Sequence, residues 1–96
     1  MDTTLAAYLR RCRTRIPPQV TRLGSYDRLP SRIGKSVTQE EVAEAIDVTR
    51  TWYGRLETDA GVYPSLTLLN RIASALMLKP IERFRLLILA AKKPGQ

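Results

Sequence analysis

The most constraining feature of this sequence is a capped helix start at residue 38. The residues TQEE at 38–41 fit the capping box, in which a threonine side chain and a glutamate three positions later each bond a backbone amide of the first helical turn. Apolar side chains follow at Val42, Ala43 and Ile46, so one side of the segment is hydrophobic. This pattern predicts a short helix over residues 39–45 that is buried on one face.

A second capped segment follows after a tight turn. Asp47 belongs to the few residue types other than glycine that tolerate a left-handed backbone conformation, and Thr49 can cap a helix over about 50–57. Two short helices joined by a turn of three or four residues form a helix-turn-helix pattern. The sequence therefore predicts such a unit over residues 38–57.

Three more segments show the spacing of amphipathic helices. They cover about 3–15, 66–77 and 80–91, and each begins at a capping residue or a proline. No segment shows the alternation of a strand, so we predict an all-α fold of five helices in one domain over residues 1–96. Besides Val42, Ala43, Ile46 and Val48, the residues expected in the core are Leu5, Tyr8, Leu9, Cys12, Ile16, Tyr53, Leu56, Leu66, Leu69, Ile72, Ala73, Leu76, Ile81, Phe84, Leu87, Ile88 and Ala91.

Composition narrows the function. The chain has 96 residues, no histidine and one cysteine, so histidine- or cysteine-based metal sites and histidine-dependent catalytic triads are excluded. No apolar run reaches the roughly 18–20 residues that span a membrane. A single cysteine forms no disulfide within the chain and fits a reducing compartment. We therefore expect a cytoplasmic protein without enzymatic activity, metal or cofactor.

The charge of the chain indicates a polyanionic partner. Its net charge is +7, and residues 1–36 carry eight basic and two acidic side chains, against eight and seven in residues 37–96. Nucleic acid is the commonest partner for such an excess, and an anionic membrane surface is the alternative. The excess is concentrated in the first third of the chain.

Residues 17–36 separate the first predicted helix from the second, and they contain three prolines, two glycines and three serines. We expect either a long loop or a loop with one helical turn near residues 18–24. Because a structureless loop of this length is unusual in a compact domain, the segment is expected to be functional or mobile. Its basic residues are Arg22, Arg28, Arg32 and Lys35.

Four short motifs follow one another along the chain: TQEEVA at 38–43, DVTR at 47–50, RLE at 55–57 and PSL at 64–66. Their order and spacing resemble the xenobiotic-response-element type, lambda-repressor-like helix-turn-helix family. The basic insertion at 17–36 and the ending ERFRLLILA resemble more closely the N-terminal DNA-binding domain of MmyB-like transcription regulators, whose chains usually carry a ligand-sensing domain downstream. The resemblance implies a five-helix fold with a long insertion between helices one and two, and sequence-specific binding of double-stranded DNA.

The same resemblance makes the second helix of the motif the recognition helix, which would lie in the major groove. Arg50, Thr51 and Arg55 match positions that read base edges. Thr51 and Arg55 are four residues apart and share a helix face, and arginine can bind guanine through two hydrogen bonds. Contacts to the DNA backbone are expected from Thr38, Gln39, Thr49 and Trp52.

Three of these roles have alternatives. Glu57 matches a glutamate that commonly pairs with an arginine of the first helix, here Arg13, and the alternative is that Glu57 accepts a hydrogen bond from cytosine. Trp52 either packs on the sugar-phosphate backbone or covers the edge of the motif. The four basic residues of the insertion either form a basic arm that reaches phosphates or the minor groove, or belong to a solvated loop that adds long-range attraction.

The last helix suggests partners besides DNA. Its residues Phe84, Leu87 and Ile88 form a homodimer interface, a seat for a downstream sensor domain, or part of the core. A second class of function is a protein-interaction module that binds a polymerase subunit, a toxin or a sensor domain, with the basic surface incidental. An RNA-binding adaptor is a weaker hypothesis, because it needs exposed stacking aromatics and the chain has few aromatic residues.

Overall fold

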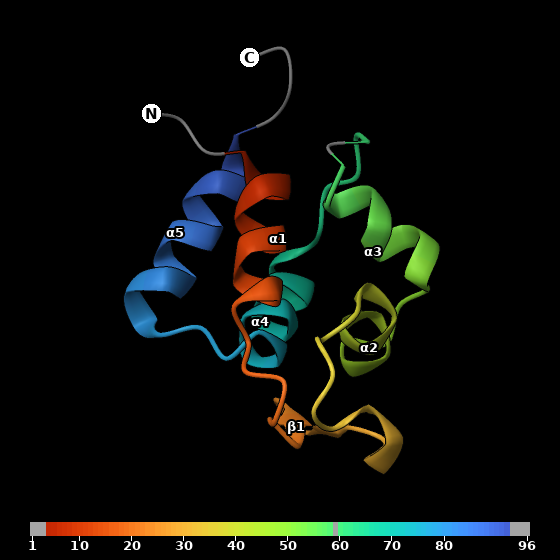
Figure 1. Ribbon diagram of the computed structural model, residues 1–96. Coiled ribbons are helices and arrows are strands. Elements are labelled where there is room, and N and C mark those ends of the chain that lie inside the picture. Colours follow the sequence, from red (N-terminus) through yellow and green to blue (C-terminus); the bar gives the residue numbers. More distant parts are fainter. Residues whose placement is uncertain (1–3, 59, 93–96) are drawn as a thin grey trace.

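The computed structural model describes residues 4–58 and 60–92, and in them five α-helices pack around one core (Figure 1). Each helix lies within two residues of the segment predicted for it, so the helical part of the predicted fold is confirmed. The outer limits of the predicted domain, residues 1–3 and 93–96, lie outside the described residues. The helices are α1 (Leu5–Thr14), α2 (Gln39–Ala45), α3 (Arg50–Leu56), α4 (Leu66–Ala75) and α5 (Pro80–Ala91).

The predicted all-α class is wrong in one detail, because the insertion contains a small antiparallel sheet. The strands β1 (Arg22–Leu23) and β2 (Tyr26–Asp27) pair, and a short 3₁₀ helix, η1 (Pro30–Arg32), follows. Neither alternative for the insertion, a long loop or a loop with one helical turn near residues 18–24, includes this hairpin. Strands of two residues are too short to show the alternation by which a strand is recognised in a sequence.

The hairpin is a packed part of the fold. Leu23 is buried in the core, and the chain turns at Gly24 with a φ of +63°, which suits glycine. A Cβ atom on Gly24 would lie 3.2 Å from the carbonyl carbon and oxygen of Ser74 in α4. This close approach holds the hairpin against α4, so the insertion is a folded layer instead of a long loop.

The predicted caps occur at four helix starts. The side chains of Thr4, Thr38, Thr49 and Ser65 each accept a hydrogen bond from a backbone amide of the following turn. At Thr38 the capping box is complete, because the carboxylate of Glu41 accepts a hydrogen bond from the Thr38 amide in return.

The turns at the ends of α2 and α4 have the same construction. Asp47 adopts the left-handed conformation expected for it, with a φ of +62°, and Met77 does so after α4, with a φ of +56°. In both turns the next amide, that of Val48 or Leu78, bonds a carbonyl five residues earlier at 2.9 Å. Methionine rarely adopts this conformation, so the second turn has no local signature in the sequence.

Around the core, α1 and α4 lie between α5 on one side and the α2–α3 pair on the other (Figure 1). Cys12, Tyr53 and Leu56 are buried, as expected. α5 is apolar on two faces, and it turns Leu86 and Leu89 inward, which spacing alone could not decide. Within the described residues, no helix has the length and apolar character needed to cross a membrane. The residues expected in the core that are exposed instead are Leu66, Ile81, Phe84, Ile88 and Ala91.

Candidate nucleic-acid interface

α3 has one buried face and one exposed face. Tyr53 and Leu56 lie in the core, while the side chains of Arg50, Thr51 and Arg55 are exposed to solvent. The structure thus places the three predicted base-reading residues together on one outward-facing helix. Neither arginine makes an ion pair with any described residue, so both guanidinium groups can donate hydrogen bonds to a ligand.

Glu57 caps the C-terminal end of α3 and is buried, with 1% of its surface exposed. Arg13 of α1 donates from Nε and Nη2 to the two carboxylate oxygens of Glu57, at 2.8 and 2.9 Å. Its Nη1 donates to the carbonyl of Val37, just before α2, at 3.0 Å. Burial raises the pKa of Glu57, but the hydrogen bonds, led by those from Arg13, outweigh burial and hold the pKa below its ordinary value. Arg13 therefore ties α1 to both ends of the helix-turn-helix unit.

Two more side chains reach Glu57. The amide Nε2 of Gln39 donates to the Glu57 carboxylate at 3.0 Å, and Nη2 of Arg10 donates to the Glu57 carbonyl at 2.8 Å. The side-chain amide of Gln39 thus links α2 to α3, and the contact of Gln39 with the DNA backbone stays a prediction. Sequence reasoning missed Arg10. The available signal was its position three residues before Arg13, because residues three apart share a helix face.

The other predicted backbone contacts lie at the helix starts and on the edge of α3. The hydroxyls of Thr38 and Thr49 accept backbone hydrogen bonds at 3.1 and 3.0 Å, with Thr49 exposed and Thr38 half-buried. Trp52 is half-buried and packs against the core. Its ring therefore covers the edge of the motif while part of it stays at the surface.

The predicted basic arm is wrong for Arg28, whose side chain is 0% exposed. Its guanidinium donates to Glu41 and is fully bonded inside the fold, so it cannot reach a phosphate. The insertion folds back on α2 and uses Arg28 as an internal anchor. The backbone carbonyls that also accept hydrogen bonds from Arg28 belong to Pro18, Val20, Arg32 and Lys35.

The other three residues of the predicted arm differ from one another. Arg32 lies half-buried beside Glu41 and donates to the carbonyl of Ser36 at 2.7 Å. Arg22 pairs with Asp27 across the exposed hairpin, at 3.0 Å. Lys35 is exposed just before α2 and makes no ion pair with a described residue.

A family model described as a helix-turn-helix domain matches residues 4–86, which is most of the chain. The chain belongs to this helix-turn-helix family. A search of curated proteins and a search of solved structures each found no match. Membership of the family indicates DNA binding by a regulator, and helix-turn-helix DNA-binding families are typically not enzymes.

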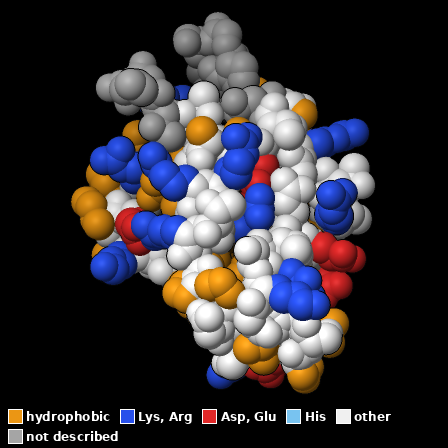
Figure 2. Space-filling model, in the orientation of Figure 1, with side chains coloured by type: hydrophobic (Ala, Val, Ile, Leu, Met, Phe, Trp, Pro, Cys, Tyr) orange, Lys and Arg blue, Asp and Glu red, His pale blue; other side chains and the backbone are white. Residues whose placement is uncertain are grey.

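Ion pairing redistributes the charge of this helix-turn-helix domain. Among the described residues, five arginines of residues 1–36 pair with carboxylates. Three of those carboxylates, Glu41, Glu57 and Glu82, lie after residue 36. The positive excess of the first third therefore serves largely to hold the fold. Figure 2 shows Lys and Arg side chains over the α1–α5 side and near α3, with acidic side chains beside α2. Basic residues exposed in residues 37–92 are Arg50, Arg55, Arg71, Lys79, Arg85 and Lys92.

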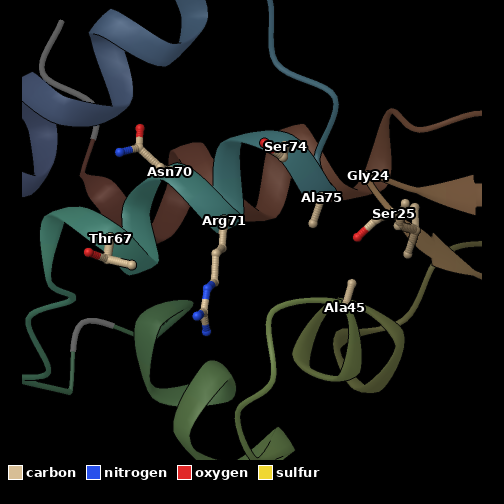
Figure 3. Close-up of a pocket in the computed structure, with 9 residues that line it drawn as sticks. Gly24, Ser25, Ala45, Thr67, Asn70, Arg71, Ser74 and Ala75 are labelled. Carbon is tan, nitrogen blue, oxygen red and sulfur yellow. The ribbon is translucent and has the colours of Figure 1, made fainter.

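The helix-turn-helix domain also has a pocket of about 430 Å³ between the hairpin, α2 and α4 (Figure 3). Figure 3 shows Ala45 and Ala75 pointing toward each other across it, and Arg71 extending from α4 toward the α2–α3 unit. Arg71 is the charged residue of the lining, which has no carboxylate or thiol. The pocket therefore lacks the paired acid and base that catalysis of proton transfer needs.

Proposed function

We propose that this chain binds double-stranded DNA sequence-specifically, as the DNA-binding part of a transcription regulator, with α3 in the major groove. The observation that carries the proposal is the exposed face of α3, where two arginines and a threonine project from a helix whose other face is fixed in the core. An α-helix fits the major groove of B-DNA, and each base pair presents a distinct pattern of donors and acceptors there.

The residues have separate roles in this proposal. Arg50 and Arg55 bind base edges, guanine O6 and N7 being the preferred acceptors, and each such contact contributes about 1–3 kcal/mol of discrimination. Thr51 reads a neighbouring base. The DNA backbone is contacted by Thr49 and Lys35, which are exposed at or near the helix starts. Thr38 and Trp52 can add contacts through the parts of their side chains that reach the surface.

We further propose that the domain is of the xenobiotic-response-element, lambda-repressor-like type, nearest to MmyB-like regulators, and that it works in the cytoplasm. Support comes from the order of the motifs and from the folded insertion between α1 and α2. A regulator of this kind would act together with a ligand-sensing domain. A homodimer through the last helix stays a prediction: Phe84 and Ile88 are exposed, and Leu87 is half-buried against the core.

Selection of bound sequences from a random duplex library tests the proposal. We expect the unmodified chain to enrich one motif, and Arg50→Ala and Arg55→Ala each to relax the preference at a different position, by about 1–3 kcal/mol. Arg85→Ala is the matched control, because Arg85 is an exposed arginine of α5, and it should select the original motif. If neither α3 variant altered the selected sequence, the assignment of the recognition helix would be wrong.

A protein-interaction module is the second candidate function, favoured by the apolar residues exposed on α5. Salt dependence separates the two functions. Binding to DNA through several phosphates should weaken by orders of magnitude between about 50 and 200 mM salt, because counterions are released from the DNA. Binding through an apolar surface should change little over the same range.

A further inference from the structure

The outward face of α5 is apolar. Ile81, Phe84 and Ile88 are 70%, 59% and 45% exposed. They follow one another at steps of three and four residues, so they form one stripe along the helix, called here the α5 stripe. Single exposed apolar residues are ordinary on protein surfaces, but a row of large ones marks an interaction surface.

Basic side chains border the α5 stripe on one side. From the periodicity of the helix, the exposed Arg85 and Lys92 lie along this edge, while Arg83 is turned back toward α4, where it donates to Asn70. The acidic residue of α5, Glu82, is turned away from the stripe and pairs with Arg15 of α1. Figure 2 shows hydrophobic side chains over α5 with Lys and Arg side chains around them. The surface is therefore apolar along the stripe and positive along one edge.

We propose that the α5 stripe binds an amphipathic helix of a partner protein whose apolar face is bordered by glutamate or aspartate. The spacing of the stripe over residues 81–88 matches the i, i+3 and i+7 anchors with which amphipathic helices dock. The apolar residues supply the buried contact, and Arg85 and Lys92 supply the charge complementarity that selects an acidic partner.

A second copy of the chain fits this surface less well. The basic edge would lie beside the same basic edge of a second copy in an antiparallel contact, and beside an uncharged edge in a parallel one, so a second copy offers it no carboxylate. The inference does not depend on DNA binding. Its residues on α5 are separate from the α3 residues proposed to contact DNA, so either proposal can fail while the other stands.

The test uses the full chain and two designed helical peptides with the same leucine stripe, one bordered by glutamates and the other by lysines. We expect calorimetric titration to show binding of the glutamate peptide only. Phe84→Ser should weaken that binding about tenfold or more, since a central aromatic anchor is lost. Arg85→Glu should weaken it too and improve binding of the lysine peptide. Leu29→Ser is the matched control, because Leu29 is 61% exposed on the insertion, and it should change nothing.

Several outcomes would overturn the proposal. One is a chain that binds neither peptide, or both equally well. A second is self-association, measured by sedimentation, that Phe84→Ser abolishes while the glutamate peptide does not bind, which would make a second copy the occupant. A third is binding to phosphatidylglycerol vesicles without binding to the glutamate peptide. We expect Phe84→Ser to bind DNA as the unmodified chain does, which shows that the variant is folded. If Phe84→Ser does not bind DNA, the effect of Arg85→Glu on binding of the two peptides tests the proposal.

Discussion

Arg28 of the insertion donates to both carboxylate oxygens of Glu41, at 2.7 and 3.2 Å, in a place where the arginine side chain has no exposed surface. The same carboxylate accepts a hydrogen bond from the amide of Thr38 and so completes the cap of α2. Burial raises the pKa of Glu41, but the hydrogen bonds from Arg28 and Thr38 outweigh it, and the pKa lies below its ordinary value. One buried pair thus fixes the insertion and the start of the helix-turn-helix unit in a single arrangement.

Removal of this anchor should destabilise the whole domain. We expect Arg28→Ala to lower the free energy of unfolding by about 3–5 kcal/mol, because Glu41 would stay buried without its partner. Urea denaturation followed by circular dichroism measures the loss. Arg22→Ala is the control, since the Arg22–Asp27 pair is exposed and should contribute little. A loss below about 1 kcal/mol for Arg28→Ala would show that this pair does not anchor the insertion.

The helices could be predicted from the sequence because their signals are local. A cap such as Thr38 or Thr49 acts on the amides of the next turn, and apolar spacing depends on neighbouring residues. The proximity of Arg13 and Glu57, 44 residues apart, has no local signal and was expected only from the resemblance of the ordered motifs to a known family.

Features that depend on distant partners could not be predicted. Arg28 looks like any loop arginine, and its burial follows only from the return of the insertion to Glu41 on α2. The choice between the two apolar faces of α5 depends on how α1 and α4 pack against it, which leaves Phe84 outside and Leu86 inside. The hydrogen bond between Gln39 and the Glu57 carboxylate joins residues from two helices and likewise has no local signal.

Acid should destabilise the domain through Glu41 and Glu57. The pKa of each is lowered from an ordinary value of 4.5, so each adds stability that is complete above that value and lost as the pH falls through the folded pKa. We expect the urea concentration at the midpoint of unfolding to be constant down to about pH 5 and to decrease at pH values below about 4.5. Glu57→Gln should start lower at neutral pH, because Arg13 loses its counter-charge, and should fall less steeply in acid. Equal slopes for the two proteins would exclude Glu57 as a source of the acid sensitivity.

The left-handed turn at Met77 should be improved by glycine. An L-residue in this conformation costs roughly 1–2 kcal/mol, whereas glycine adopts it without a steric penalty but has more freedom when unfolded. The net expectation for Met77→Gly is a gain of about 0.5 kcal/mol in the free energy of unfolding. Met77→Ala keeps the Cβ atom and is the matched control. The explanation fails if the glycine variant is no more stable than the alanine variant in urea.

Lys35 should contribute affinity for DNA without contributing specificity. It is the member of the predicted basic arm that is exposed and has no ion-pair partner among the described residues. If it contacts a phosphate, Lys35→Ala should weaken binding to specific and unrelated duplexes by a similar factor, and should lower the slope of log affinity against log salt by about 0.9. Fluorescence anisotropy between about 50 and 200 mM salt measures both quantities.

Arg22→Ala separates this local contact from general attraction, because Arg22 lies on the hairpin and is already paired with Asp27. The slope of log affinity against log salt should change less in Arg22→Ala than in Lys35→Ala. The opposite order would mean that the hairpin, and not the chain entering α2, lies against the DNA. A lost phosphate contact must reduce the number of counterions released, and so lower the slope of log affinity against log salt. If Lys35→Ala lost affinity without a change in that slope, the lysine would instead act on the fold around Arg28, whose guanidinium donates to the Lys35 carbonyl.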